Sequence, residues 1–399
     1  MMTDYIYAGA ATLIIFLSLL VGTKKRKELS DYILIFWLLL LFVNSLSFII
    51  IWRSNYPVSF AGRFIVELSE ASIFIHGPVF LFYTMSLTKA GLTIKPRHLF
   101  HLIPFLVCLL ILMAAIMVAD GVGAIIRQIV SVCKMVSLLI YTTVVIIQLK
   151  NHRKQVETIF SNTENKYLNW LNFLAWGIII VWILSSTGLI LYGLTWFRIP
   201  QYGGIIGNIA VCIFIFLVGF FGVKQEAIFH FTPGEKRSIE SDGMVDTAAE
   251  AITDDSLFAH TILPEENASE LTINEKYKNS GLSKQKALDL FQVLENFMKN
   301  QKPYHDPEIT LFGLAKQLDI HPNHLSQIIN QHYSQNFFDY INEYRIKDVK
   351  DVLLSGKYDT FSLAGIGFEC GFNSKASFNR AFKKFTGVTP SEFRKNAKS

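Results

Sequence analysis

Basic and amide side chains recur at helical spacing near the C-terminus of this 399-residue chain: Lys375, Asn379, Arg380 and Lys383. Four apolar residues between them follow the i, i+3, i+4, i+7 pattern of a buried helical stripe: Phe378, Ala381, Phe382 and Phe385. Amide and guanidinium groups hydrogen-bond to the edges of nucleic-acid bases, and ammonium groups neutralise phosphates. The pattern indicates a helix that packs on a core with one side and offers donors to a polyanion with the other.

A short helix and a tight turn precede this stretch. The sequence predicts a helix over 362–370 and a turn at Gly371, and Ser374 suits the N-cap of the next helix. Gly365 and Gly367 lie inside the short helix, where each costs up to about 1 kcal/mol relative to alanine, so we expect a loose helix. Two helices joined by a tight turn, with a polar outer face, are typical of a helix-turn-helix unit.

A second unit of the same design lies upstream. Its first helix has an apolar stripe at Leu311, Leu314, Ala315 and Leu318. The turn 319–321 follows, and Pro322 suits the first position of the next helix, where its missing N–H costs nothing. In that helix the residues expected to point inward are Leu325, Ile328 and Ile329. The residues expected on the outer face are Asn323, Ser326, Gln327 and Asn330.

Two further helices complete this region. Residues 337–354 could form one helix about 27 Å long, which would place the two units roughly one turn of DNA, or about 34 Å, apart. An earlier helix follows the candidate N-cap Ser283, with apolar residues at every third position: Leu288, Phe291, Leu294 and Phe297. After Gly371 the chain has seven basic residues against Glu392 alone, which is an electrostatic footprint suited to phosphates.

These segments resemble a known family. "NEYRIKDVKDVLL", "GFNSKASFNRAFKKFTG" and "TPSEFRK" are similar to the DNA-binding domain of AraC/XylS-type transcription regulators, over about residues 283–399. The resemblance implies that the second helix of each unit enters the major groove of DNA. By position, it assigns base contacts to Asn323, Ser326, Gln327, Lys375, Ala376, Asn379 and Arg380. Asp319 departs from the family, which often has glycine at this turn, but aspartate tolerates left-handed geometry better than most residues.

The basic C-terminal end also suggests which side chains contact phosphates. We expect these contacts from Lys383, Lys384 and Arg394. His321 and His324 are three residues apart, but no third ligand is evident, so we expect no metal and no cofactor. The four cysteines form no CxxC pair, which argues against a cysteine-rich zinc site or a disulfide scaffold.

The first half of the chain has a different character. Seven apolar runs each approach the length that spans a bilayer: 5–22, 31–52, 64–87, 99–119, 126–149, 169–192 and 203–223. Because lipid offers no hydrogen-bond partners to the backbone, these runs are expected to be helices. The sequence therefore predicts an all-α chain with seven transmembrane helices, similar to membrane-anchored, seven-helix regulators of the same family.

Loop charges predict the orientation of these helices. Eleven Lys and Arg residues lie in the first, third and fifth loops, against four on the other side. Because cytoplasmic loops carry the excess of positive charge, we expect the N-terminus outside and the C-terminal domain in the cytoplasm. Together with the resemblance, this predicts a multi-pass protein of the bacterial cytoplasmic (inner) membrane.

Several polar groups lie within the apolar runs and are candidates for intramembrane sensing: Glu67, Glu70, His76 and Lys134. Asn44 lies in such a run as well. The alternative is that Glu67 and Glu70 pair with Lys134 or Arg127 and hold the helices together. The sequence leaves both interpretations open.

Charge divides the chain into three regions. The net charge is +8 over 1–223, −7 over 224–282 and +4 over 283–399. The middle region lacks apolar periodicity, so we expect an acidic flexible linker between a seven-helix membrane region and a domain with two helix-turn-helix units. Its 59 residues would span roughly 40–50 Å as a flexible coil.

The sequence favours a membrane-tethered, sequence-specific DNA-binding transcription regulator that couples a signal at the membrane to gene expression. A transporter or channel with a cytoplasmic regulatory domain is the alternative, although no internal repeat is evident. No catalytic constellation is present in the apolar runs, so we expect no enzyme activity. The expected partners are double-stranded DNA, the lipid bilayer and an unidentified membrane or periplasmic signal, and a homodimer is left open.

Overall fold

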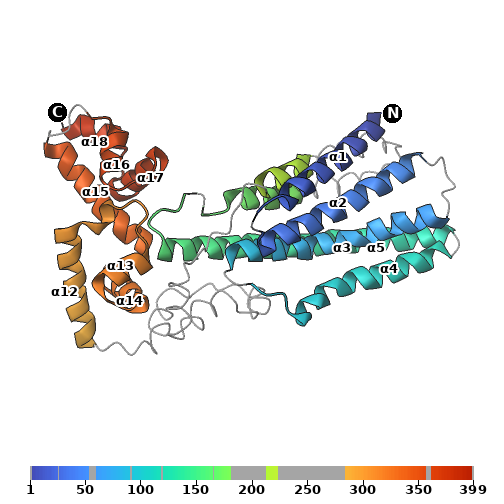
Figure 1. The fold of residues 1–399 in the computed structure, drawn as a ribbon, viewed down its shortest axis with the longest axis horizontal. Helices are drawn as coiled ribbons and strands as arrows, with labels where there is room; N and C mark the ends of the chain where they lie inside the picture. Colours follow the sequence, from blue (N-terminus) through green and yellow to red (C-terminus); the bar gives the residue numbers. More distant parts are fainter. Residues whose placement is uncertain are drawn as a thin grey trace. The chain divides into compact units, whose positions relative to one another are not determined.

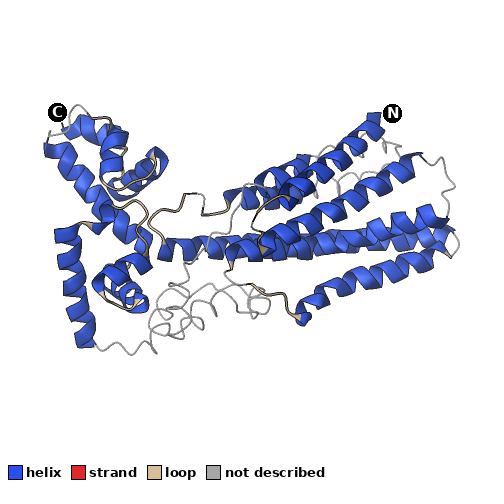
Figure 2. Cartoon of the chain, viewed as in Figure 1, coloured by secondary structure: helices blue, strands red, loops and turns tan. Residues whose placement is uncertain are grey.

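The computed structural model describes residues 2–25, 27–53, 60–89, 92–117, 120–164, 166–180, 213–222, 284–355 and 361–397. The described residues contain helices and no β-strand (Figure 2). They divide into two compact units. The N-terminal unit comprises the described residues of 1–149 and 168–222, and the C-terminal unit comprises those of 150–167 and 284–397.

Long apolar helices make up most of the N-terminal unit (Figure 1). They are α1 (Met2–Gly22), α2 (Leu29–Arg53), α3 (Phe60–Thr88), the 3₁₀ helix η1 (Pro96–Leu102), α4 (Ile103–Ile116) and α5 (Asp120–Ile159). Two shorter apolar helices follow at Asn169–Ile180 and Ile213–Gly222. The last residues of α5, from Lys150 onward, belong to the C-terminal unit.

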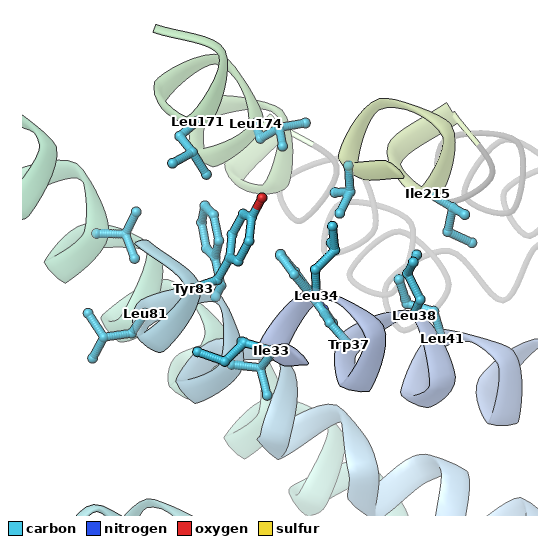
Figure 3. Packing of buried hydrophobic residues seen from close by; sticks show 14 of the residues in the cluster. Ile33, Leu34, Trp37, Leu38, Leu41, Leu81, Tyr83, Leu171, Leu174 and Ile215 are labelled. Atoms are coloured by element: carbon cyan, nitrogen blue, oxygen red, sulfur yellow. The ribbon is translucent and has the colours of Figure 1, made fainter. Parts of the chain in front are cut away.

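A continuous apolar core holds the N-terminal unit together. Trp37 of α2 lies near its centre, with ring centroids 5.4 Å from Phe80 and 5.9 Å from Phe214. Leu34 and Tyr83 are buried in the same cluster (Figure 3). Since α2, α3 and the Ile213–Gly222 helix each contribute a side chain, this core joins segments that are far apart in the sequence.

Other apolar side chains of this unit face outward. Along α4 and its surroundings, Phe100 is 70%, Leu110 is 70% and Met117 is 77% exposed. Four helical stretches are long and apolar enough to cross a membrane by length and composition: Leu29–Ser47, Phe60–Thr88, Pro96–Ile116 and Ile125–Ile159. The predicted number of seven spans is not confirmed, because the remaining apolar helices are shorter within the described residues and the sixth and seventh runs lie partly outside them.

Seven α-helices form the C-terminal domain, which we define as the described residues of 284–397. They are α12 (Lys284–Gln301), α13 (Leu311–Leu318), α14 (Pro322–Tyr333), α15 (Phe337–Ser355), α16 (Leu363–Glu369), α17 (Lys375–Thr386) and α18 (Pro390–Ala397), with the 3₁₀ helix η3 (Pro303–His305) after α12. One apolar cluster packs α12–α14 on the first part of α15, and another packs α16–α18 on its second part. The long helix α15 therefore carries one helix-turn-helix unit at each end, as the sequence predicts.

Local signals place the helix boundaries. The Thr310, Ser362 and Ser374 side chains accept hydrogen bonds from backbone N–H groups three residues on and cap α13, α16 and α17. Asp319 ends α13 in a left-handed conformation, with φ 54° and ψ 41°. The N-cap prediction at Ser374 is confirmed, whereas the candidate cap Ser283 lies outside the described residues.

Two expectations need correction. The every-third-residue pattern in α12 holds at three of its four positions, because Leu294 is buried and Phe291 and Phe297 pack against the core. Leu288 is 47% exposed instead, and the other buried residues are Ala287 and Met298. A helix has 3.6 residues per turn, so a spacing of three drifts off the buried face. Gly367 does not mark a loose helix: a Cβ there would lie 2.8 Å from the Phe378 ring, so its missing side chain lets α17 pack closely on α16.

Candidate nucleic-acid interface

One face of α17 is exposed and carries the groups expected from the sequence: Lys375, Ala376, Asn379, Arg380, Lys383 and Lys384. Five of these six, all except Ala376, join Thr389, Pro390 and Ser391 in lining an open hollow of about 680 Å³. The opposite face is buried, with Phe378 1% and Phe382 0% exposed. The helix therefore has one orientation on its core and presents its amide and guanidinium donors to solvent.

The polar face of α14 differs in one respect from the prediction. Asn323 and Ser326 are partly exposed, and the Asn330 amide donates to the Ser326 carbonyl oxygen at 2.9 Å. Gln327 is only 6% exposed, and its Oε1 has no hydrogen-bond partner. Because buried polar atoms normally have partners, this amide would gain one by turning toward a ligand.

The three expected phosphate contacts lie in different surroundings. Lys383 is exposed on α17. Lys384 is also exposed, but its Nζ lies 2.6 Å from the Asp339 carboxylate of α15. Arg394 of α18 donates to the Phe361 carbonyl oxygen at 3.1 Å. A phosphate bound by Lys384 would therefore compete with an existing ion pair.

Arg345 is a buried cation at the middle of α15, only 2% exposed. Its Nε donates to the Tyr304 carbonyl oxygen and its Nη2 to the Asp306 carbonyl oxygen, both at 2.7 Å. Burial lowers the pKa of Arg345 to about 10, so the guanidinium stays charged at neutral pH. It ties α15 to the segment that precedes α13, a role that was not predicted from the sequence.

Asp348 makes a second tie one turn further along α15. It accepts hydrogen bonds from Lys302 Nζ at 2.9 Å and Tyr304 Oη at 3.1 Å, and lies 2.9 Å from His305 Nε2. Burial acts to raise the pKa of Asp348, but the hydrogen bonds from Lys302 and His305 outweigh burial and lower it. The charged carboxylate therefore holds η3 against α15.

Within the N-terminal unit, the candidate sensing residues lie in two groups. Glu67 pairs with Arg127 at 3.6 Å, and Glu70 pairs with Lys134. His76 lies apart from them, where the Trp37 indole donates to its Nδ1 at 3.0 Å. One Glu67 oxygen is buried without a hydrogen-bond partner.

Comparison with known proteins adds an independent finding. Residues 314–396 match a family model described as a helix-turn-helix domain. They form a helix-turn-helix domain of the AraC type. The AraC-type domain includes α14 and α17, the two helices whose polar faces are described above.

Curated relatives match the same part of the chain. The uncharacterized HTH-type transcriptional regulator YpdC of Escherichia coli is 32% identical over 93 residues, covering 23% of this chain and 31% of that protein. YtdP of Bacillus subtilis, another uncharacterized HTH-type transcriptional regulator, is 29% identical over 94 residues, covering 24% of this chain and 12% of that protein. The transcriptional regulatory protein HptR of Staphylococcus aureus is 26% identical over 137 residues, covering 32% of this chain and 53% of that protein. The chain thus spans between about an eighth and about a half of the length of these relatives, and the similarity supports a DNA-binding regulator.

A solved structure of a protein of unknown function from Listeria innocua is 30% identical and covers 26% of this chain and 93% of that one. Its TM-score of 0.23 is too low for a comparison of folds.

Proposed function

We propose that this protein is a membrane-tethered, sequence-specific DNA-binding transcription regulator. The observation that carries the proposal is the two-sided character of α17, which buries Phe378 and Phe382 and exposes Lys375, Asn379 and Arg380. Guanidinium and ammonium groups suit guanine edges, and amides suit adenine edges. A helix with these groups on its outer face is equipped to read bases in a major groove.

The AraC-type domain would read DNA at two places. Asn323 and Ser326 of α14 are partly exposed and would contact one groove, and α17 would contact the next. Gln327 would join them by turning its buried amide outward, which would give its unpaired Oε1 a partner. Ala376 has no polar group and would touch only a thymine methyl. Lys383, Lys384 and Arg394 would hold the flanking phosphates.

The apolar half supports the membrane tether. Large side chains such as Phe100 and Leu110 remain exposed on a stretch of bilayer length, Pro96–Ile116, and exposed apolar surface of this kind marks contact with lipid or a partner. With eleven positive loop charges on one side, the AraC-type domain would lie in the cytoplasm. The paired Glu67–Arg127 and Glu70–Lys134 groups would respond to the signal, because breaking either pair would leave a costly charge in the membrane.

Mapping of cross-linked DNA in cells tests this function. The full-length protein should be cross-linked at a limited set of promoter regions that share a sequence with two boxes about one helical turn apart. The variant Asn379→Ala/Arg380→Ala should lose these sites while remaining in the membrane fraction. Uniform recovery of DNA by both proteins would contradict the proposal.

A further inference from the structure

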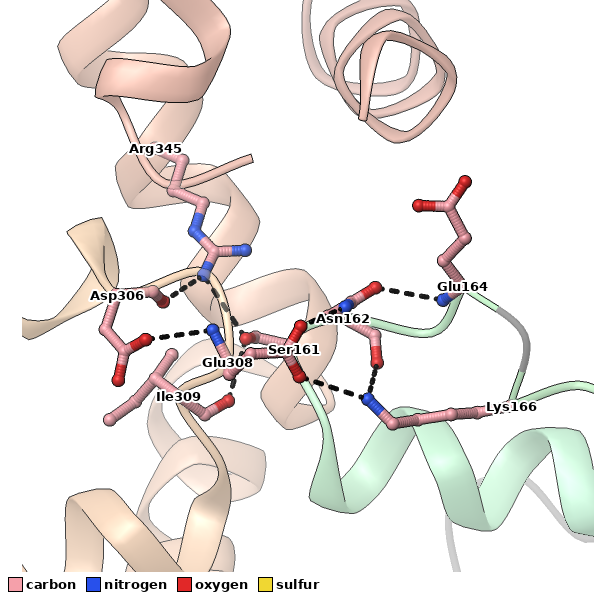
Figure 4. Close-up of polar contacts among 8 residues, drawn as sticks. All are labelled: Ser161, Asn162, Glu164, Lys166, Asp306, Glu308, Ile309 and Arg345. Carbon is pink, nitrogen blue, oxygen red and sulfur yellow. Dashed lines mark hydrogen bonds and ion pairs between the residues drawn. The ribbon is translucent and has the colours of Figure 1, made fainter. Parts of the chain in front are cut away.

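A loop that precedes the C-terminal domain in the sequence contacts that domain. Residues 160–166 follow α5 in the C-terminal unit, and all of them except Asn165 are described. Phe160 and Thr310 form an antiparallel bridge. The Ser161 backbone N–H and Oγ both donate to the Ile309 carbonyl oxygen, at 3.4 Å and 2.7 Å (Figure 4). Ser161 is only 3% exposed, so this serine is buried in the contact.

The buried serine also meets Arg345. The Arg345 Nη2 donates to Ser161 Oγ at 3.2 Å and to the Asp306 carbonyl oxygen at 2.7 Å (Figure 4). The Nε of the same guanidinium donates to the Tyr304 carbonyl oxygen. A buried cation needs all its donors satisfied, because an unpaired one costs about 1–3 kcal/mol or more. The loop therefore supplies an acceptor that the arginine needs.

Arg345 reaches the second helix-turn-helix unit as well. Its guanidinium carbon lies 5.6 Å from the centre of the Phe372 ring. Gly371, with φ 94°, comes so close that an added Cβ would lie 2.9 Å from Arg345 Nε and 2.3 Å from the Tyr304 carbonyl oxygen. One side chain thus contacts the loop, the segment before α13 and the turn before α17.

An outer ring of polar contacts surrounds Ser161. The Asn162 amide donates to Glu308 Oε1 at 2.5 Å, and Lys166 Nζ lies 3.4 Å from Glu308 Oε2. The Asn336 amide donates to Glu157 Oε2 at 3.5 Å. The two contacts to Glu308 are exposed, so each adds little stability, but they fix which residues of the loop face which residues of the domain.

We infer that residues 160–164 together with Lys166 are a docking segment for the C-terminal domain, and that its seat is the 306–310 backbone together with Arg345. Docking fixes the position of Arg345. Through Arg345 it fixes the relative orientation of α14 and α17, the two reading helices, in the conformation that binds DNA. The effect on DNA affinity rests on the proposed function, whereas the docking itself does not. Because the segment continues directly from α5, it is the route by which a change in the apolar half would reach the reading helices.

A zero-length carbodiimide cross-link tests the docking in the full chain, reconstituted in lipid nanodiscs. The reagent joins amines to carboxylates that are already in contact, so mass spectrometry should find a Lys166–Glu308 link within one chain. Ser161→Arg places a second guanidinium beside Arg345 and should abolish the link. Glu164→Arg is the matched control, because the Glu164 carboxylate points away from Lys166 (Figure 4). Absence of the link in the unmodified protein, or a link only between two chains, would overturn the inference.

DNA affinity of the same preparations tests the consequence. Ser161→Arg should weaken sequence-specific binding about fivefold, because the domain loses preorganisation, and Glu164→Arg should leave it unchanged. Equal affinity of the two variants would overturn the positioning role. If the link forms but no variant prefers any DNA sequence, the docking is supported and the proposed function fails.

Discussion

At the scale of single residues, Arg380 and its neighbours are the side chains that we propose for base recognition by α17. Arg380 is exposed on the same face as Asn379 and Lys375, and Phe378 and Phe382 hold that face outward. A guanidinium presents paired donors that match the two acceptors of guanine. Base recognition and phosphate binding can therefore be separated by substituting single side chains.

Arg380→Ala should cost about 1–3 kcal/mol of binding free energy on the preferred sequence and relax the preference at one base pair. Affinities for a panel of duplexes, each with one base pair changed, measure this directly. An equal loss on every duplex would instead identify Arg380 as a phosphate contact.

Lys383→Ala should lower the slope of log affinity against log salt by about one, without changing sequence preference. Lys384→Ala should lower the slope by less, because Asp339 already neutralises this ammonium at 2.6 Å. Titrations at several salt concentrations give both slopes. A larger effect at Lys384 than at Lys383 would show that the Asp339 pair opens on DNA.

At the scale of elements, close packing of α16 on α17 depends on Gly367. A Cβ at this position would lie 2.8 Å from the Phe378 ring, whereas one at Gly365 would meet Ser362 Oγ at 3.2 Å. Two glycines in the same short helix thus have different roles, and the sequence alone does not separate them.

Gly367→Ala should destabilise the AraC-type domain by about 1–3 kcal/mol, because overpacking pushes Phe378 off its site. Gly365→Ala is the control and should be nearly neutral, because Ser362 Oγ need give by only a few tenths of an ångström and can keep its cap, while alanine favours the helix. Thermal loss of circular dichroism compares the two variants. Equal stabilities would show that α17 can shift at little cost.

The hydrogen bonds of Asp348, which hold η3 against α15, predict that the stability of the domain falls in acid. Because the folded-state pKa of Asp348 is lowered, its contribution to stability is full above the ordinary carboxylate pKa and is lost as pH falls through the lowered value. The melting temperature of the unmodified protein should therefore fall more steeply below about pH 4 than that of Asp348→Asn. Parallel curves would exclude this carboxylate as a source of acid sensitivity.

Sequence reasoning succeeded where the signal is local. The cap at Ser374, the turn at Gly371 and the stripe in α17 all involve residues within a few positions of one another. It did not identify Arg345, whose partners Tyr304 and Ser161 lie 41 and 184 residues away. The exposure of the Leu288 side chain and the burial of the Gln327 side chain were also missed, because both depend on how neighbouring helices pack.

At the scale of the whole molecule, an apolar N-terminal half and a C-terminal domain that contains an AraC-type helix-turn-helix domain share one chain. Loop charges predict that the C-terminal domain lies in the cytoplasm, where DNA is. A reporter that is active only in the cytoplasm should therefore be active when it is fused after Ser399. A reporter that is active only outside the cytoplasm should be active when it is fused to the N-terminus. Activity of the C-terminal reporter outside the cell membrane would overturn the predicted topology.

The central claim is that the exposed face of α17 reads sequence in duplex DNA. The most direct measurement is the affinity of the full chain in nanodiscs for a duplex selected from a random pool, compared with unselected duplex at physiological salt. We predict an affinity ratio of at least about 10³, which falls sharply in Asn379→Ala/Arg380→Ala. A folded protein that binds both duplexes equally would contradict the account.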